Sequence, residues 1–148
     1  MKKFLLIIAA IFCCTIGANA QETPDYFCLT FHTTATVSGR YITFYRANSS
    51  WTIPSLEYKI NNGEWTKIEM GSGSTSVSTP TLNDGDKVYI RATGTGEEGN
   101  KTFSESTTNY FYMYTTTGNT ELSVSGNIMS LLDRDNFENL DLVPRYAF

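Results

Sequence analysis

The chain has 148 residues, of which 41% are hydrophobic and 18% are charged, and its formal net charge is −4 at pH 7. This length fits one domain of modest size. Beyond the first twenty residues the basic residues are scattered singly, so charge and composition argue against nucleic-acid binding and against attraction to anionic membrane surfaces.

The first twenty residues have the pattern of a secretory signal peptide. Lys2 and Lys3 form a charged beginning, and residues 4–16 form an uncharged, largely apolar run. A run of thirteen residues is too short for a bilayer core, which needs about 20 residues. We therefore predict export of the chain and no transmembrane anchor.

The end of this segment predicts where the signal is removed. Ala18 and Ala20 place small side chains at the −3 and −1 positions read by signal peptidase. Cleavage after Ala20 makes Gln21 the mature N-terminus. The mature 128 residues then hold 9 basic and 15 acidic side chains, a net charge of −6. The expected location is the cell surface or the extracellular space, with the periplasm as an alternative.

The positions of the three cysteines argue against a lipoprotein signal and against a disulfide in the mature chain. Cys13 follows Phe12, and Cys14 follows Cys13, whereas a lipoprotein signal needs a small residue before its cysteine. Only Cys28 survives processing, so an intramolecular disulfide is excluded even in an oxidising compartment. Stability must come from a hydrophobic core, to which nine Tyr and two Trp contribute large side chains.

Between residues 26 and 128, helical periodicity is nearly absent. Short runs rich in Thr, Tyr, Val, Ile and Phe alternate with Gly, Asn, Asp, Ser and Pro. We predict an all-β fold, an Ig- or fibronectin-like antiparallel β-sandwich of about seven strands over residues 21–126. The predicted strands are 26–34, 41–46, 56–60, 65–70, 87–93, 110–114 and 122–125.

The clearest local element is a hairpin in LEYKINNGEWTKIEM. Asn62 and Gly63 form its turn, because both residues tolerate positive φ. A two-residue loop would mix charged residues into the apolar face, so we predict a three-residue loop over 61–63 with Gly63 in the left-handed bulge position. The apolar pairs are then Tyr58 with Thr66 and Leu56 with Ile68.

The same register places charged groups on the opposite face of the hairpin. Glu57 lies opposite Lys67, which predicts a charge pair. Lys59 lies opposite Trp65, which predicts a cation–π contact.

Two later segments predict which side chains enter the core. After a turn at Asp84 and Gly85, alternation points Val88, Ile90 and Ala92 inward and Tyr89 and Arg91 outward. In YFYMY, residues 111 and 113 are expected to point inward, and the tyrosines at 110, 112 and 114 to line the other surface or a second contact. The glycine-rich stretches 71–76 and 94–102 are predicted to be flexible polar loops.

The last segment, 127–148, is the only one with a helical pattern. Ile128, Leu131 and Leu132 have helical spacing, and Asp133 ends the apolar pattern.

The signal peptide, LEYKINNGEW, LNDGDKVYIRATG and above all SGNIMSLLD together resemble one family. They are similar to the N-terminal β-domain of BspA-like leucine-rich-repeat surface proteins of Gram-negative gut anaerobes. The resemblance implies an Ig-like domain followed by a capping segment that begins a solenoid of repeats. It covers most of the mature chain and is best over residues 56–132.

One departure from this family is expected to matter. The chain stops at Phe148, where the resemblance implies a repeat array, so the expected recognition surface is missing. We interpret the chain as a short or truncated member. Residues 129–148 are predicted either to be poorly ordered or to pack back on the sandwich.

Catalytic and metal chemistry find little support in the sequence. His32 is the only histidine, and Cys28 lies four residues away on the same face of a strand, roughly 13 Å distant, too far for direct contact. We predict that the cysteine belongs to the core, that the chain is not an enzyme, and that it holds no cofactor or metal.

Paired carboxylates are instead interpreted as solvated turn residues and a helix end. The segment DRDNFENLDLV has Phe137 where a calcium loop requires an oxygen ligand. The carboxylates considered are Asp84 and Asp86, Glu97 and Glu98, and Asp133, Asp135 and Glu138.

Two tryptophans are the candidate ligand-stacking residues. Trp51 in NSSWTIPS and Trp65 on the polar hairpin face could stack on sugar rings, or each could be a packing residue. The leading hypothesis is a non-enzymatic exported module that serves as spacer, cap or adhesion domain, and the alternative is a carbohydrate-binding module. The expected partner is a host or glycan ligand at the cell surface, and the oligomeric state is left open.

Overall fold

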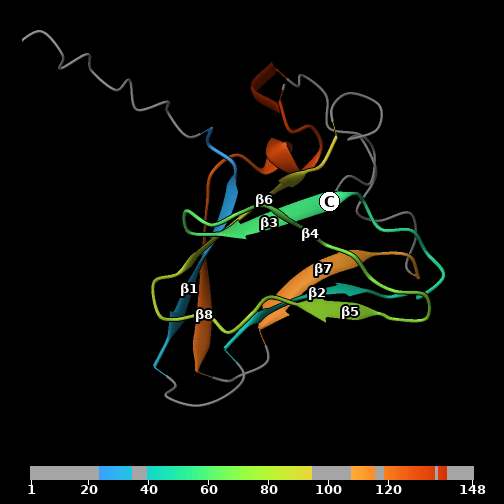
Figure 1. Cartoon of the computed structure of the whole chain (residues 1–148), viewed down its shortest axis with the longest axis horizontal. Helices are drawn as coiled ribbons and strands as arrows, with labels where there is room; N and C mark the ends of the chain where they lie inside the picture. The colour runs from blue at the N-terminus through green and yellow to red at the C-terminus, as the bar shows by residue number, and fades with distance from the viewer. Residues whose placement is uncertain (1–23, 35–39, 95–107, 116–118, 136, 140–148) are drawn as a thin grey trace, which may run out of the picture.

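Alternating polarity along short runs produces two antiparallel sheets in the computed structural model, which describes residues 24–34, 40–94, 108–115, 119–135 and 137–139 (Figure 1). The large sheet has the strand order β4-β3-β6-β1-β8, and the small sheet has the order β5-β2-β7. The predicted all-β sandwich is confirmed, with eight strands. Their bounds are Phe27–Thr33 (β1), Ile42–Arg46 (β2), Leu56–Ile60 (β3), Thr66–Lys67 (β4), Ser76–Ser78 (β5), Lys87–Ala92 (β6), Phe111–Thr115 (β7) and Thr120–Ser125 (β8).

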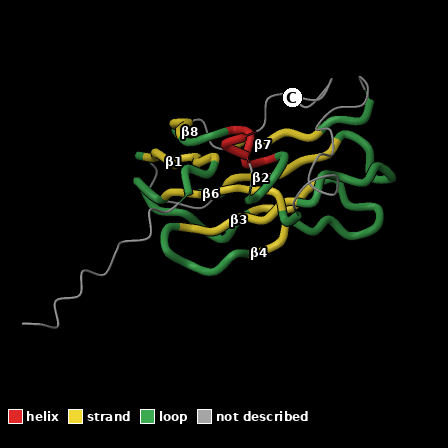
Figure 2. Tube along the Cα trace, turned by 90° about the horizontal axis from the view of Figure 1, so that it is seen from above, coloured by secondary structure: helices red, strands yellow, loops and turns green. Residues whose placement is uncertain are grey.

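The strand order has one distinctive feature. Figure 2 shows the five strands of the large sheet following one another from β8 to β4. The first strand, β1, lies between β6 and β8, whereas the first strand of an immunoglobulin domain lies beside the second. Strand β2 pairs with β5 in the small sheet, and β3 pairs with β6 in the large sheet. Consecutive strands such as β2 and β3 therefore lie in opposite sheets, and the core is enclosed between them.

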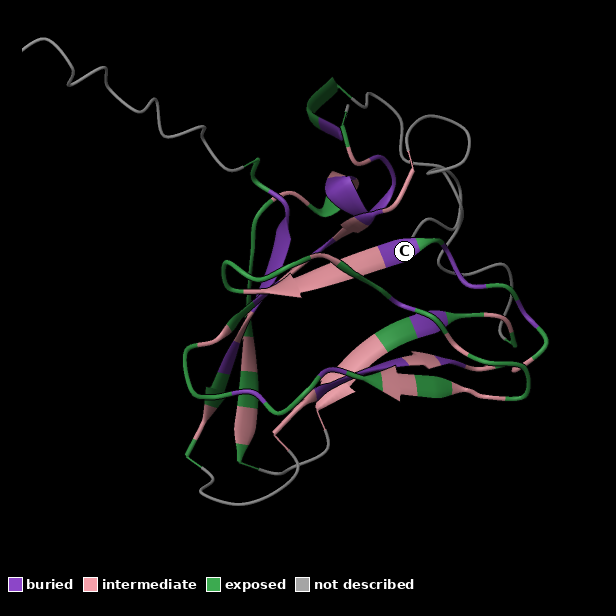
Figure 3. Cartoon of the chain, in the orientation of Figure 1, coloured by how far each residue is buried: buried purple, intermediate pink, exposed green. Residues whose placement is uncertain are grey.

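The core lies between the sheets and is centred on Phe44 of β2. Its ring is 5.5 Å from the ring of Tyr58 on β3 and 6.4 Å from that of Phe111 on β7, so one side chain joins both sheets. Val88 and Ile90 are fully buried, as predicted, and along β7 buried and exposed residues share one strand (Figure 3). Other core residues are Leu29, Phe31, Ile42, Trp51, Ile53, Leu56, Ile68, Leu82, Leu131 and Leu132.

The β3–β4 hairpin has the predicted register but a different turn geometry. Tyr58 pairs with Thr66, as a three-residue loop requires. The left-handed residue is Asn61 (φ 52°) rather than Gly63, so the predicted position of Gly63 in the bulge is wrong. Asparagine tolerates this conformation, and its side chain donates to Asp86 (2.8 Å) and accepts from the Lys87 amide (2.9 Å), which fixes the loop against the turn before β6.

Two other predictions are corrected by the strand bounds. Residues 71–76 were expected to be loop only, but Ser76 begins β5, a strand that pairs Val77 with Phe44 of β2. This strand contributes a single half-buried apolar residue, which is too little for an alternation pattern. The strand predicted over 65–70 is limited to β4, although the Ile68 amide still donates to the Leu56 carbonyl (2.8 Å).

The segment after β8 folds onto the sandwich. Its described residues form two 3-10 turns, η2 (Ile128–Leu131) and η3 (Phe137–Asn139), at one end of the molecule (Figure 1). The turn η2 contacts β6 and β1, and η3 contacts η2. Leu131 and Leu132 are buried in the core, whereas Ile128, predicted on the same apolar pattern, is exposed. The helical character is therefore 3-10, and the described part of the predicted tail packs back on the sandwich.

Two residues make this packing specific. Gly126 has φ +76°, and a Cβ at this position would collide with the Tyr26 carbonyl oxygen. The Ser130 hydroxyl, which is fully buried, accepts a hydrogen bond from the Phe27 amide of β1 (2.9 Å) and donates to the Ile90 carbonyl of β6 (3.4 Å). The segment thus bridges two neighbouring strands of the large sheet.

Arg46, at the end of β2, connects two loops through hydrogen bonds. Its guanidinium is buried and donates to three backbone carbonyls, those of Ser74 (2.8 Å), Trp51 (2.8 Å) and Gly71 (2.9 Å). These acceptors belong to two separate loops. A buried charge is tolerated only when its donors are satisfied, so Arg46 holds both loops in place.

We predict that Gly126→Ala lowers the free energy of unfolding much more than Gly73→Ala. Both glycines have positive φ, but a Cβ on Gly73 would meet nothing within 4 Å. The control should lose about 1–2 kcal/mol for its backbone conformation, and Gly126→Ala about 2 kcal/mol more because of the collision with Tyr26. Urea denaturation of the mature protein measures both, and equal losses would contradict the close approach.

We predict that Arg46→Met destabilises the mature protein by about 3 kcal/mol, because three loop carbonyls lose a charged donor. The matched control is Lys67→Met on the exposed strand β4, which should change stability by no more than about 0.5 kcal/mol. Thermal unfolding followed by circular dichroism distinguishes the two. A loss for Arg46→Met as small as that of the control would show that Arg46 does not hold the loops.

Candidate functional site

The outer face of the large sheet carries a cluster around Trp65. The Arg91 guanidinium carbon lies 3.8 Å from the Trp65 ring centroid, and Lys59 Nζ lies 5.1 Å from it. The Tyr26 ring meets Trp65 edge-on at 5.5 Å. The cation–π contact predicted between Lys59 and Trp65 is confirmed, and the half-buried Trp65 ring already contacts two cations and one aromatic ring.

An ion pair connects this cluster to β3. Arg91 Nε donates to Glu57 at 2.7 Å, and Arg91 also donates to the Tyr26 hydroxyl at 2.9 Å. Glu57 lies opposite Lys67 as predicted, but its ion pair in the structure is with Arg91, which lies opposite it on β6. The predicted charge pair is therefore replaced by one on the other neighbouring strand.

Trp51 lies in the core, in the loop after β2. It is 8% exposed, and its carbonyl accepts a hydrogen bond from Arg46. This burial leaves little ring surface for a ligand to stack on. Trp51 and Trp65 therefore lie in different environments, one inside the sandwich and one on the outer face of the large sheet, and their role in ligand stacking stays a prediction.

The outer face of the small sheet carries four tyrosines. Tyr45 of β2 lies opposite Tyr112 of β7, with ring centroids 4.8 Å apart. Tyr110 and Tyr114 flank Tyr112 at 5.9 and 5.5 Å. The prediction that 110, 112 and 114 face away from Phe111 and Met113 is confirmed. Tyr112 is 41% exposed and Tyr110 38% exposed, and we call this surface the tyrosine face.

Sequence reasoning missed Tyr45 as a member of this surface. The run YFYMY shows three tyrosines on one side of a strand, but only the pairing of β2 with β7 adds the fourth. The sequence signal that could have placed Tyr45 on the outer face is its alternation with Phe44 and Arg46, which are both buried on the same strand.

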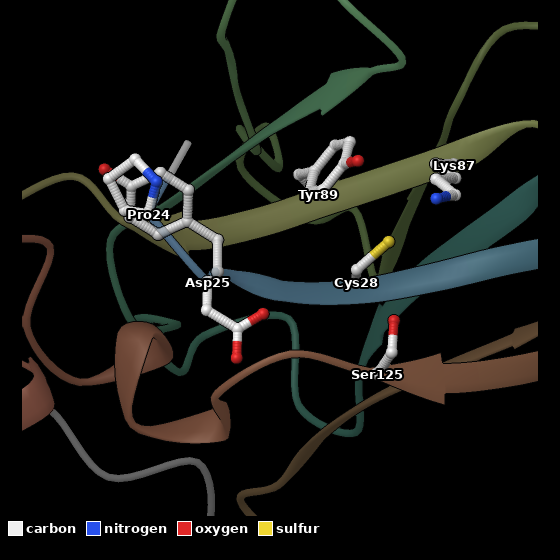
Figure 4. Close-up of a pocket in the computed structure, with 7 residues that line it drawn as sticks. Pro24, Asp25, Cys28, Lys87, Tyr89 and Ser125 are labelled. Carbon is white, nitrogen blue, oxygen red and sulfur yellow. The ribbon is translucent and has the colours of Figure 1, made fainter. Parts of the chain in front are cut away.

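A small pocket of about 210 Å³ lies on the outer face of β1, over Cys28 (Figure 4). The thiol is 4% exposed and lies between Lys87, Tyr89 and Ser125. Burial raises the pKa of Cys28, and the hydrogen bond with Ser125 only partly offsets this. The group therefore stays a thiol at neutral pH, which is the less nucleophilic form.

His32 is not brought to Cys28. Both residues lie on β1, four positions apart, and the His32 ring shares a hydrogen bond with Ser123 of β8 (3.0 Å). His32 borders a second, polar pocket of about 430 Å³, which Asp84 and Glu121 also line. The structure thus gives the histidine a partner on β8 and places it away from the thiol.

The two carboxylates of the turn before β6, Asp84 and Asp86, have hydrogen-bond partners that hold the turn in place. Asp86 accepts from the backbone of Asn83 and from the side chain of Asn61, and these hydrogen bonds lower its pKa. Asp84 accepts from the Thr33 amide (2.9 Å), which ties the turn to the end of β1.

The last acidic group forms part of the tail. Asp133 is buried and accepts from the Asp135 amide (3.0 Å), Asp135 forms an ion pair with Arg134 (2.9 Å), and Glu138 is exposed. Within the described residues, no three His, Cys, Asp or Glu side chains are grouped so that they could hold a metal ion.

Several predicted features lie outside the described residues. These are the signal peptide with Ala18, Ala20 and Gln21, the carboxylates Glu97 and Glu98, and residues 140–148. In the part of the chain that is described, no helix has the length and apolar character needed to cross a membrane.

Neither a protein-family model, nor a curated protein, nor a solved structure matches the chain.

We predict that Cys28 of the native mature protein reacts with a thiol reagent at least a hundredfold more slowly than after denaturation, because the thiol is buried and its pKa is raised. Labelling with Ellman's reagent at pH 8 measures both rates. The matched control is Ser72→Cys in a Cys28→Ala background, which places a thiol in an exposed loop. If native Cys28 reacted as fast as this control, its burial would be contradicted.

Proposed function

We propose that the mature chain is a non-enzymatic exported module that serves as a spacer, cap or adhesion domain of a surface or secreted protein. The observation that carries this proposal is the docking of Gly126–Asp133 on the sandwich. A segment held by core burial and by the Ser130 bridge leaves the sandwich in a fixed direction. A spacer or cap requires such a rigid junction.

The surroundings of Cys28 and His32 argue against a Cys–His catalytic pair. A thiol nucleophile needs a base within hydrogen-bond reach, but the Cys28 thiol is buried with a raised pKa, and the His32 ring hydrogen-bonds to Ser123 instead. Both residues are more simply explained as parts of the outer face of β1.

Carbohydrate binding is a second candidate function, and the tyrosine face favours it. Aromatic side chains with an apolar ring and a polar hydroxyl suit ligands that present both kinds of surface. In this reading the module adheres to glycans, and the docked tail holds the binding face at a fixed orientation.

Export is tested by producing the full chain with a C-terminal tag in a Gram-negative host. We predict a mature product that begins at Gln21 and is accessible to antibody on intact cells or present in the medium. Ala20→Leu should block processing because a bulky residue at −1 is not cleaved, whereas the control Asn19→Gln at −2 should be processed normally. A full-length product retained in the cytoplasm would contradict the proposal.

A further inference from the structure

The side chains of the tyrosine face are not needed for the hydrophobic core. The inward side chains of the same strands, Phe44, Phe111 and Met113, already supply the small sheet's share of the core. Exposed aromatic side chains on the opposite face add little to this core. A contiguous group of them marks a surface that contacts something other than the protein's own interior.

The chemistry of the face is uncharged and rich in hydroxyls. In register with Tyr45 and Thr43 of β2 lie two exposed serines of β5, Ser76 and Ser78. On the other side Tyr114 lies opposite Thr43. Every outward side chain of the three strands is therefore Tyr, Thr or Ser, although the mature chain has a net charge of −6.

The tyrosine hydroxyls are available to a ligand as neutral groups. None of the four has a hydrogen-bond partner among the described residues. The pKa of Tyr112 is raised because partial desolvation and the neighbouring Tyr45, Tyr110 and Tyr114 oppose its ionisation. The Tyr112 hydroxyl therefore remains a donor as well as an acceptor over the physiological pH range.

This combination selects the class of ligand. Aromatic rings contact apolar C–H surfaces, while the hydroxyls and serines exchange hydrogen bonds. The outward side chains of β2, β5 and β7 carry no charge that would attract an ionic group. A neutral sugar ring has an apolar C–H face bordered by hydroxyls. A second copy of the chain fits less well, because a stable interface needs about 20–30 residues on each side, and this face presents seven side chains.

We propose that the tyrosine face is a binding site for uncharged carbohydrate, with Tyr45 and Tyr112 at its centre. The proposal rests on the carbohydrate-binding candidate function and deepens it by placing the site on the small sheet, away from Trp65.

The test is affinity electrophoresis of the mature protein through gels that contain a neutral polysaccharide, such as laminarin, mannan or xylan, or polygalacturonate as the charged comparison. We expect at least one neutral polysaccharide to retard the protein and polygalacturonate not to retard it. Tyr112→Ala should weaken the retarding interaction at least tenfold, and Tyr112→Phe should weaken it less because the ring remains.

Trp65→Ala is the matched control on the other sheet and should bind like the wild type. Circular dichroism and thermal unfolding establish that each variant is folded, and if Tyr112→Ala does not fold, Tyr114→Ala replaces it. If Trp65→Ala loses binding while Tyr112→Ala and Tyr112→Phe keep it, the proposed site is wrong although the protein still binds carbohydrate.

The remaining outcomes each overturn the inference. If no neutral polysaccharide retards the wild-type protein, carbohydrate binding and the site fall together, and the spacer or cap function is unaffected. Stronger retardation by polygalacturonate would contradict an uncharged ligand. A dimer in sedimentation velocity that Tyr112→Ala dissociates would assign the face to self-association.

Discussion

The rest of the structure depends on the close approach of the chain at Gly126 to the backbone of Tyr26. This contact leaves no space for a side chain at position 126, and it brings the following residues under the start of β1. Asn127 then caps η2 by accepting from the Met129 amide (2.9 Å), and Ser130 reaches the Phe27 amide. These contacts position Leu131 and Leu132, which are buried in the core.

The same arrangement explains why SGNIMSLLD looks like a motif. Its glycine permits the positive φ, its asparagine caps a turn, its serine bridges two strands and its leucines are buried. Each of these residue types is explained by a contact within one domain, whereas Ile128 of the same motif is exposed. The motif therefore has a physical role in this sandwich that does not depend on a following repeat.

The two outer faces of the sandwich have different chemistry. On the large sheet, Arg91 and Lys59 cover Trp65, and Glu57 neutralises Arg91, so aromatic and charged groups satisfy one another. On the small sheet, the ring contacts of Tyr45 and Tyr112 among the described residues are with each other and with their tyrosine neighbours. The first face is internally paired, whereas the tyrosine hydroxyls of the second have no hydrogen-bond partner among the described residues.

Much of the fold could be predicted from the sequence because alternation and turn chemistry are local. The inward positions of β6 and β7 and the hairpin register of β3 and β4 follow from patterns within a few residues. The left-handed Asn61 could not be predicted, since its partners Asp86 and Lys87 are distant in the sequence.

The functional surfaces were harder to predict for the same reason. Tyr45 joins the tyrosine face through strand pairing, and Arg91 displaces Lys67 as the partner of Glu57 through β6. Arg46 gives no local signal at all, because its three carbonyl acceptors belong to loops whose positions depend on the whole fold.

The central claim, that residues 126–133 belong to the sandwich, is tested most directly by amide hydrogen exchange of the mature protein measured by NMR. The Phe27 amide, which donates to Ser130, and the Leu132 amide, which donates to Met129, should exchange as slowly as the Phe31 amide of β1. Rapid exchange of Phe27 and Leu132 beside a protected Phe31 would show that the segment detaches from an otherwise intact sandwich, and would contradict this account.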